Sequence, residues 1–231
     1  VNTVNLLDTL NITANISGIP QNMTFNNDGT KLYLPDSTAG DIVQYTLPSA
    51  YDVPNGTLAP DTTLDLSGTV SNAQAVVFNN DGTKVFVLDG SPDEVESYTL
   101  SSPYDLASTV TNLPNELLDI TIETDPQGMA FSSDGTKFFV LGNSGNDVNE
   151  YDIAVPFDLS TASFVDSPDV ASEETSPQGF AFTADGRKMY VGGGTGNLHE
   201  YRLAIAYDAS TAVLVAETSL AAQDSNITGL A

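Results

Sequence analysis

The chain has 231 residues, 40 % of them hydrophobic, and no cysteine. A chain of this size and composition can bury a core, which argues against disorder, and the lack of cysteine excludes disulfides, thiolate metal sites and a cysteine nucleophile. The 31 acidic and 6 basic residues give a formal net charge of −25, which repels nucleic acid and anionic lipid, and no apolar run is long enough to insert into a membrane.

Residues 1–19 are expected to form an outer strand, because Leu6-Leu7-Asp8 follows the pattern of Leu64-Asp65 and Leu118-Asp119 later in the chain. After this segment one turn sequence recurs with a period of about fifty residues, which is typical of a repeat architecture. Its four copies are Asp28-Gly29-Thr30-Lys31, Asp81-Gly82-Thr83-Lys84, Asp134-Gly135-Thr136-Lys137 and Asp185-Gly186-Arg187-Lys188. They predict blade repeats at 20–72, 73–125, 126–176 and 177–226, and the start of a further blade at 227–231.

Each repeat contains signals for four antiparallel strands, as the first copy illustrates. Gln21 opens a strand with large side chains at every second position, and Asp28-Gly29 supplies a tight hairpin turn. The apolar run Leu32–Leu34 predicts a second strand buried on both faces. A third strand ends near Tyr45, and a more polar fourth strand follows the loop Tyr51-Asp52. This order predicts an all-β fold, a β-propeller of four-stranded antiparallel blades.

The two ends of the repeat array predict that the four visible blades are part of a larger ring. An outer strand precedes the first repeat, and Gly229-Leu230-Ala231 aligns with Gly179-Phe180-Ala181 at the start of an inner strand. Because a closed propeller joins its first and last strands in one blade, we expect the remaining blades to come from the same longer chain, or otherwise from a second chain. Apolar blade faces would be left exposed without them.

The repeat, with its Asp-Gly turn followed by a hydrophobic-aromatic-hydrophobic strand, resembles the YVTN-type and lactonase-like propellers over residues 20–231. More narrowly, the Asp-Gly-Thr-Lys turn, the later Val-x-x-Tyr and the Tyr/Phe-Asp loop resemble repeats of secreted or virion-associated proteins of marine bacteria and phages. The resemblance implies an extracellular, cell-surface or virion location. It specifies a blade, and no activity follows from it alone.

Four glutamines open the innermost strands, at the rim of the expected central channel. They are Gln21, Gln74, Gln127 and Gln178. A ring of amides could bind the hydroxyl groups of a sugar or a cation. Alternatively, each amide could connect neighbouring blades through hydrogen bonds to backbone groups.

Acidic residues recur in the turn between the second and third strands. Asp41, Glu94 and Asp147 occupy equivalent positions, with Asp36 and Asp89 just upstream. Oxygen-rich turns of this kind could hold calcium. No EF-hand spacing is present, and Asp can cap its own turn, so no cofactor is required and calcium is one alternative.

The remaining candidate side chains are basic or imidazole groups. The turn lysines Lys31, Lys84, Lys137 and Lys188 are expected to form structural ion pairs, because one hairpin position repeats in every blade. His199 is the single histidine, and with Arg202 it is the nearest approach to a specialised polar set in one blade. A lone imidazole cannot build a multi-histidine metal site.

Three functions remain open from the sequence. Near-identical repeats favour a non-catalytic propeller scaffold that binds a glycan or a protein through its loops. A structural role as a spacer or shell subunit is the alternative, and a lactonase-like hydrolase with its site at the channel mouth is a further alternative that the resemblance permits.

Overall fold

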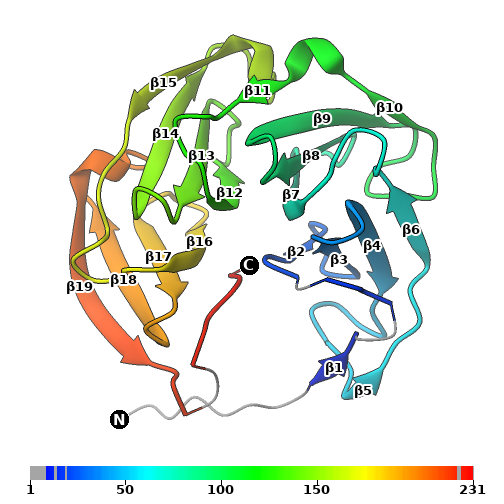
Figure 1. Ribbon diagram of the computed structural model, residues 1–231, viewed down its shortest axis with the longest axis horizontal. Coiled ribbons are helices and arrows are strands. Elements are labelled where there is room, and N and C mark those ends of the chain that lie inside the picture. Colours follow the sequence, from blue (N-terminus) through cyan, green and yellow to red (C-terminus); the bar gives the residue numbers. More distant parts are fainter. Residues whose placement is uncertain (1–8, 13–14, 19, 223–224, 231) are drawn as a thin grey trace.

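The computed structural model describes residues 9–12, 15–18, 20–222 and 225–230, and these ranges form a β-propeller of four antiparallel blades around a central axis (Figure 1). The predicted all-β propeller is confirmed. The Leu6-Leu7-Asp8 pattern lies outside the described residues. No helix in the described ranges is long and apolar enough to span a membrane.

The blades follow one another in chain order, and we number them I to IV. Blade I contains β2 (Thr24–Phe25), β3 (Lys31–Asp36), β4 (Asp41–Thr46) and β6 (Thr62–Asp65). Blade II contains β7 (Ala73–Phe78), β8 (Lys84–Asp89) and β9 (Glu94–Leu100), and its outer edge is divided between β10 (Val110–Asn112) and β11 (Leu118–Asp119).

The last two blades have an unbroken outer strand. Blade III contains β12 (Pro126–Phe131), β13 (Lys137–Gly142), β14 (Asp147–Ile153) and β15 (Ala162–Asp166). Blade IV contains β16 (Pro177–Phe182), β17 (Lys188–Gly193), β18 (Asn197–Leu203) and β19 (Ala212–Ser219). Three short 3-10 turns, at Pro114–Glu116, Leu159–Thr161 and Ala209–Thr211, precede outer strands.

Every Asp-Gly turn is closed by an aromatic ring from the loop between the third and fourth strands. In blade I, Gly29 has a φ of +69°, a region that L residues rarely adopt, and the N–H of Tyr51 donates to the Gly29 carbonyl over 2.8 Å. A Cβ on Gly29 would lie 2.4 Å from the Tyr51 ring. Glycine is therefore required here both by the backbone conformation and by the ring above it.

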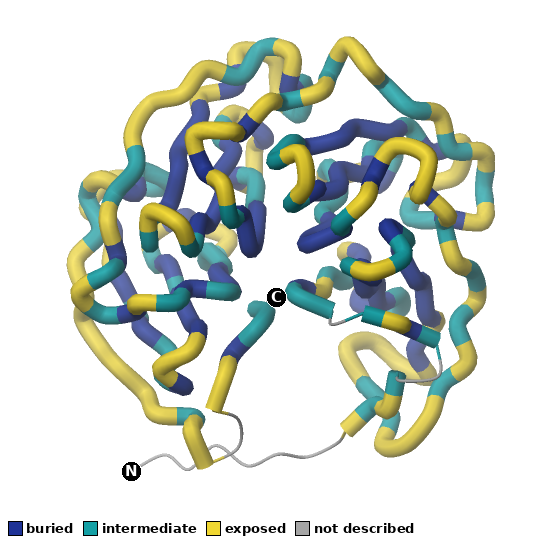
Figure 2. The backbone as a smooth tube through the Cα atoms, in the orientation of Figure 1, coloured by how far each residue is buried: buried dark blue, intermediate teal, exposed yellow. Residues whose placement is uncertain are grey.

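Hydrophobic cores lie between neighbouring blades, where the tube in Figure 2 is mostly dark blue, and the same aromatic contact recurs in each of them. The third large residue of an inner strand packs on the second strand of the preceding blade. The ring centroids are 4.5 Å apart for Tyr33–Phe78, 4.7 Å for Phe86–Phe131 and 4.6 Å for Phe139–Phe182. Each such pair adds about 1 kcal/mol beyond simple burial.

The free face of blade I and the space beside blade IV are occupied by the chain ends. Leu10, Ile12 and Ile16 contribute to a core on blade I, and β1 (Leu10–Asn11) pairs in parallel with β5 (Gly56–Thr57). The C-terminal segment enters between blades IV and I: Gly229 lies against Asn22 on one side and against Gly179 on the other (Figure 1). Residues 227–230 thus reach the place of a further inner strand without strand pairing.

Candidate functional site

The two ends of the propeller differ chemically, and we name them by their connections. The Asp-Gly end carries the Asp-Gly turns and the aromatic loops. The connector end carries the segments that join one blade to the next and the turns between second and third strands, which hydrogen-bond to each other, as in Gly90 N–H to Asn72 O over 3.0 Å and Asn143 N–H to Asp125 O over 3.0 Å.

In the described residues, inner-strand side chains line cavities of about 330 and 250 Å³, and residues of the Asp-Gly turns and aromatic loops also line the smaller one. The larger is lined by inner-strand side chains such as Met129, Phe180 and Phe182, together with Leu230. No Asp, Glu, Lys, Arg or His lines either of these two cavities.

A buried carboxylate at the connector end of each blade accepts backbone N–H groups, and we call it the latch carboxylate. In blade II, Asp89 at the end of β8 accepts from the N–H groups of Ser71 and Asn72, each over 2.9 Å. Asp36 does the same in blade I, accepting from Ser17 and Gly18. These two sequence-predicted calcium residues are thus bound to the backbone.

In blades III and IV the latch carboxylate has moved from the strand to the connector. Glu123 accepts from the N–H groups of Ser144 (3.1 Å) and Gly145 (3.3 Å). Glycine stands where Asp89 stands in blade II: a Cβ on Gly142 would lie 1.8 Å from the Glu123 carboxylate. Blade IV repeats the exchange with Glu174 and Gly193. Each blade therefore keeps one buried carboxylate at the same position in the connector end, supplied either by the second strand or by the connector.

The remaining predicted calcium residues have raised pKa values. Burial, followed by the charge of Asp65, raises the pKa of Asp41, and burial, followed by Glu96, raises that of Glu94. Burial and the nearby Glu123 charge raise the pKa of Asp147 to about 6. Among the described residues no three His, Asp or Glu side chains converge in a way that could hold a metal ion. Calcium binding remains a prediction.

The four inner-strand glutamines lie at the connector end in different states. Gln127 donates to the Asp125 carboxylate over 2.6 Å. The side-chain oxygens of Gln74 and Gln178 are buried without a hydrogen-bond partner, and Gln74 as a whole is 6 % exposed. Gln21 is half-buried. No single arrangement is therefore shared by all four amides.

Two further oxygens in the described residues share the state of these glutamine oxygens. Asp93 Oδ1 and Asn143 Oδ1 are buried acceptors without a donor. The pKa of Asp93 is raised, by burial first and then by Asp125, so these two acids lie near each other. Asn143 donates to Asp125 over 2.7 Å. The connector end of blades II to IV therefore presents acceptor oxygens that lack donors, a state that buried polar atoms rarely keep.

A hydrogen-bond donor, the hydroxyl of Tyr151, lies near the acidic residues of the connector end. The Tyr151 hydroxyl is buried without a partner, and burial together with the charges of Asp119, Asp147 and Glu123 raises its pKa to about 12. It is therefore a neutral hydrogen-bond donor near Asp147. Sequence reasoning missed Tyr151, because every repeat has a tyrosine at this position. In the structure the hydroxyls of Tyr98 and Tyr201 have hydrogen-bond partners, whereas those of Tyr45 and Tyr151 are buried without one.

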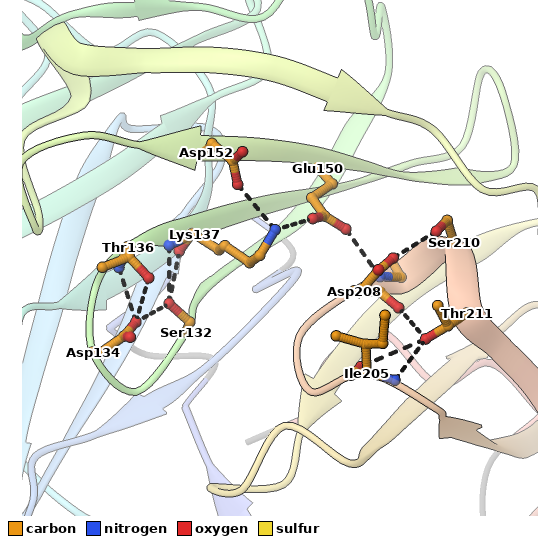
Figure 3. A network of polar contacts seen from close by, with 11 residues as sticks. Ser132, Asp134, Thr136, Lys137, Glu150, Asp152, Ile205, Asp208, Ser210 and Thr211 are labelled. Carbon is orange, nitrogen blue, oxygen red and sulfur yellow. Dashed lines mark hydrogen bonds and ion pairs between the residues drawn. The ribbon is translucent and has the colours of Figure 1, made fainter.

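The lysines form ion pairs, as predicted. Lys84 is 2.6 Å from Glu116, Lys188 is 2.8 Å from Glu200, and Lys31 is 3.9 Å from Asp105. Lys137 pairs with both Glu150 and Asp152 (Figure 3).

His199 and Arg202 are not brought together. His199 is fully buried, with Nδ1 3.6 Å from Glu217 and Nε2 4.0 Å from Glu174, whereas Arg202 is exposed near the Asp-Gly end. The two side chains therefore do not form one polar site.

No protein-family model and no curated protein sequence matches the chain. Solved structures do match. A protein from Lactobacillus plantarum has a TM-score of 0.58 at 15 % identity over 87 % of this chain and 57 % of its own. A candidate 6-phosphogluconolactonase from Bacteroides uniformis gives 0.58 at 16 % identity, over 86 % and 57 %. A periplasmic gluconolactonase from Pseudomonas aeruginosa gives 0.56 at 18 % identity, over 88 % and 55 %.

These matches establish the fold, a β-propeller resembling lactonase-like propellers, and the chain spans a little over half the length of the matched structures. They also correct the functional expectation. The non-catalytic scaffold for glycan or protein binding is the wrong reading, because the matched propellers that carry a functional name are named as lactonases. Near-identical repeats were weak evidence against catalysis, since residues that differ between blades can lie within a repeated frame.

Proposed function

We propose that the chain is part of a propeller enzyme that hydrolyses a lactone, with its reacting groups at the connector end of blade III. The observation that carries the proposal is the set of buried oxygens without donors: Gln74 Oε1, Asp93 Oδ1, Asn143 Oδ1 and Gln178 Oε1. Such acceptors suit a ligand rich in hydroxyl donors, as a sugar lactone is. The lactonase names of the matched structures support the reaction class.

In this proposal Asp147 is the general base. Its pKa of about 6 leaves it ionised at neutral pH, yet basic enough to accept a proton from water. The activated water attacks the lactone carbonyl, and the Tyr151 hydroxyl donates a hydrogen bond to the oxygen that becomes negatively charged. The ring C–O bond then breaks, and the ring oxygen takes the proton back from Asp147. The product is the open hydroxy acid.

The test is acid release from glucono-δ-lactone and a panel of γ- and δ-lactones, followed in a pH-stat above the spontaneous rate. Asp147→Asn should lower kcat by about 100-fold or more, since it removes the base. Gln74→Leu should raise KM with a smaller effect on kcat. Asp52→Asn at the Asp-Gly end, which only accepts from Ser49, is the matched control and should behave like the parent. Equal turnover by parent and Asp147→Asn would refute the assignment.

We also propose the location and the narrower likeness that the sequence predicts. An extracellular, cell-surface or virion location and the likeness to marine or phage repeats are supported by the acidic composition and the repeat motif. One matched structure is a periplasmic enzyme.

A further inference from the structure

Each of blades I to III contacts the aromatic loop of the following blade through side chains of its second or third strand. In blade I, Lys31 Nζ and the Tyr33 hydroxyl both donate to the Tyr104 carbonyl of blade II, over 2.9 and 2.6 Å. The side-chain oxygen of Gln44 accepts from the Leu106 N–H over 2.9 Å. Three side chains thus hold the backbone of one loop.

In blade III the residue equivalent to Gln44 is a carboxylate, and it also contacts the following loop. Glu150, the repeat equivalent of Gln44, accepts from the Ala209 N–H of blade IV over 2.9 Å, and Lys137 pairs with Glu150 (Figure 3). The acceptor at this position on the third strand therefore reaches the loop backbone of the following blade in two separate interfaces.

Blade IV carries all three groups in the same register. Lys188, Tyr190 and Glu200 stand where Lys31, Tyr33 and Gln44 stand in blade I, and Tyr190 pairs with Glu200 across β17 and β18 as Tyr33 pairs with Gln44 across β3 and β4. Within the described residues no aromatic loop lies on them. Tyr190 and Glu200 are half-buried, and the Glu200 carboxylate is paired with Lys188 of its own blade.

The surroundings of this face fit an aromatic–aspartate loop. A cavity of about 640 Å³ beside it is lined by Arg187, Lys188 and Arg202, three of the 6 basic residues of the chain, and also by Asp185 of the Asp-Gly turn. Every aromatic loop carries an aspartate after its aromatic residue, and in blade II that residue, Asp105, lies 3.9 Å from Lys31 of blade I. Lys188, the repeat equivalent of Lys31, therefore lies where such an aspartate would be placed.

The geometry points to the open face of blade IV as a docking surface for a further blade of this same repeat, with Lys188, Tyr190 and Glu200 holding the backbone of its aromatic–aspartate loop. Register specifies the occupant, because these three positions hold this loop in blade I and the position of Glu200 also holds it in blade III. On this face Ile227 packs on Gly192 and Leu198 is half-buried, and the three polar groups specify the contact.

The test adds the blade. Because Gly229-Leu230-Ala231 aligns with Gly179-Phe180-Ala181, a copy of residues 182–222 appended after Ala231 continues a blade in register. The extended chain should melt about 5 °C above the parent, and amides of β17 and β18 should exchange about tenfold more slowly. Glu200→Ala should remove a large part of the shift in the extended chain and leave the melting temperature of the parent unchanged. An unchanged melting temperature with folded added residues would overturn the proposal.

A second measurement does not depend on whether the added blade folds. In the parent, Glu150→Ala should speed amide exchange at Ala209 and lower the melting temperature, because that interface is occupied, whereas Glu200→Ala should do neither. Equal destabilisation by both variants would show that the blade IV face already has a partner within the chain and would overturn the proposal. A concentration-dependent dimer in sedimentation that Glu200→Ala abolishes would assign the face to a second copy, and would overturn it as well.

Discussion

The Asp-Gly end and the connector end of the propeller are built from the same repeat, yet they have diverged to different degrees. At the Asp-Gly end all four turns keep an aspartate that accepts from the N–H two residues later, over about 3 Å, and a glycine under an aromatic ring. At the connector end the latch carboxylate lies on the second strand in blades I and II and on the connector in blades III and IV, and the buried acceptor oxygens without donors lie in blades II to IV of the described residues. Uniform chemistry at one end indicates a structural requirement, and variation at the other leaves room for a site.

The largest change in stability is expected when the latch carboxylate of blade III is returned from the connector to the second strand. Gly142→Asp would put a second carboxylate onto Glu123 and should lower the free energy of unfolding by about 3 kcal/mol, since one buried charge is left unpaired. Adding Glu123→Val gives blade III the arrangement of blade II, with Asp89 and Val70, and should recover most of the loss. Urea unfolding of the parent, both single variants and the double variant measures the coupling.

An additive result would contradict the exchange. If the double variant lost the sum of the two single losses, the carboxylates of blades II and III would not be interchangeable. The connector end would then tolerate less variation than its sequence indicates.

An intermediate effect is expected at the Asp-Gly end. Gly135 has a φ of +71° and lies under the Phe157 ring, so Gly135→Ala should cost about 2 kcal/mol from backbone strain and overpacking. Gly68 has open space around its Cβ position, so Gly68→Ala is the matched control and should change stability little. Thermal unfolding compares the two. Equal stability of both variants would remove the case that this turn is fixed by its ring.

The sequence predicted the frame well because the frame repeats. Four Asp-Gly turns, apolar second strands and the terminal tyrosines of the third strands specify blades without any long-range information, and the structure confirms the propeller. The aromatic loop was visible as Tyr51-Asp52, but its role over Gly29 was not, because a ring stacked on a glycine leaves no periodic signal.

The candidate site at the connector end was harder to predict, because it depends on which buried oxygens have no hydrogen-bond donor, and this cannot be read from the sequence. Asp36 and Asp89 looked like calcium ligands, and the structure binds both to the backbone. An alignment of the repeats could have found the latch exchange, because Gly142 replaces Asp89 where Glu123 replaces Val70. The pKa of Asp147 could not be found in this way, since it depends on burial and on Glu123.

The smallest expected effect is a difference in pH dependence between the two ends. At the Asp-Gly end, hydrogen bonds from Thr136 lower the pKa of Asp134, so its contribution is present above the unfolded pKa and is lost as the pH falls through the lowered value. Asp147 has the opposite sign. Its raised pKa means that the folded state loses stability as the pH rises from the ordinary aspartate pKa of 3.8 toward about 6. Asp147→Asn should therefore stabilise the protein at pH 7, by about 1 kcal/mol once the partial exposure of the carboxyl is allowed for.

The gain in stability from Asp147→Asn should vanish below pH 3.8, where the carboxyl is protonated in both the folded and the unfolded state. Asp134→Asn should show no gain in stability at any pH. Denaturant unfolding at pH 3.5, 5 and 7 separates the two variants. A variant that is more stable and no longer hydrolyses lactones would have the signature of a residue retained for chemistry at the expense of stability. If Asp147→Asn were instead less stable at pH 7, the Asp147 carboxylate would be a structural group like the latch carboxylates. The differences between blades at the connector end would then not support a catalytic site in blade III.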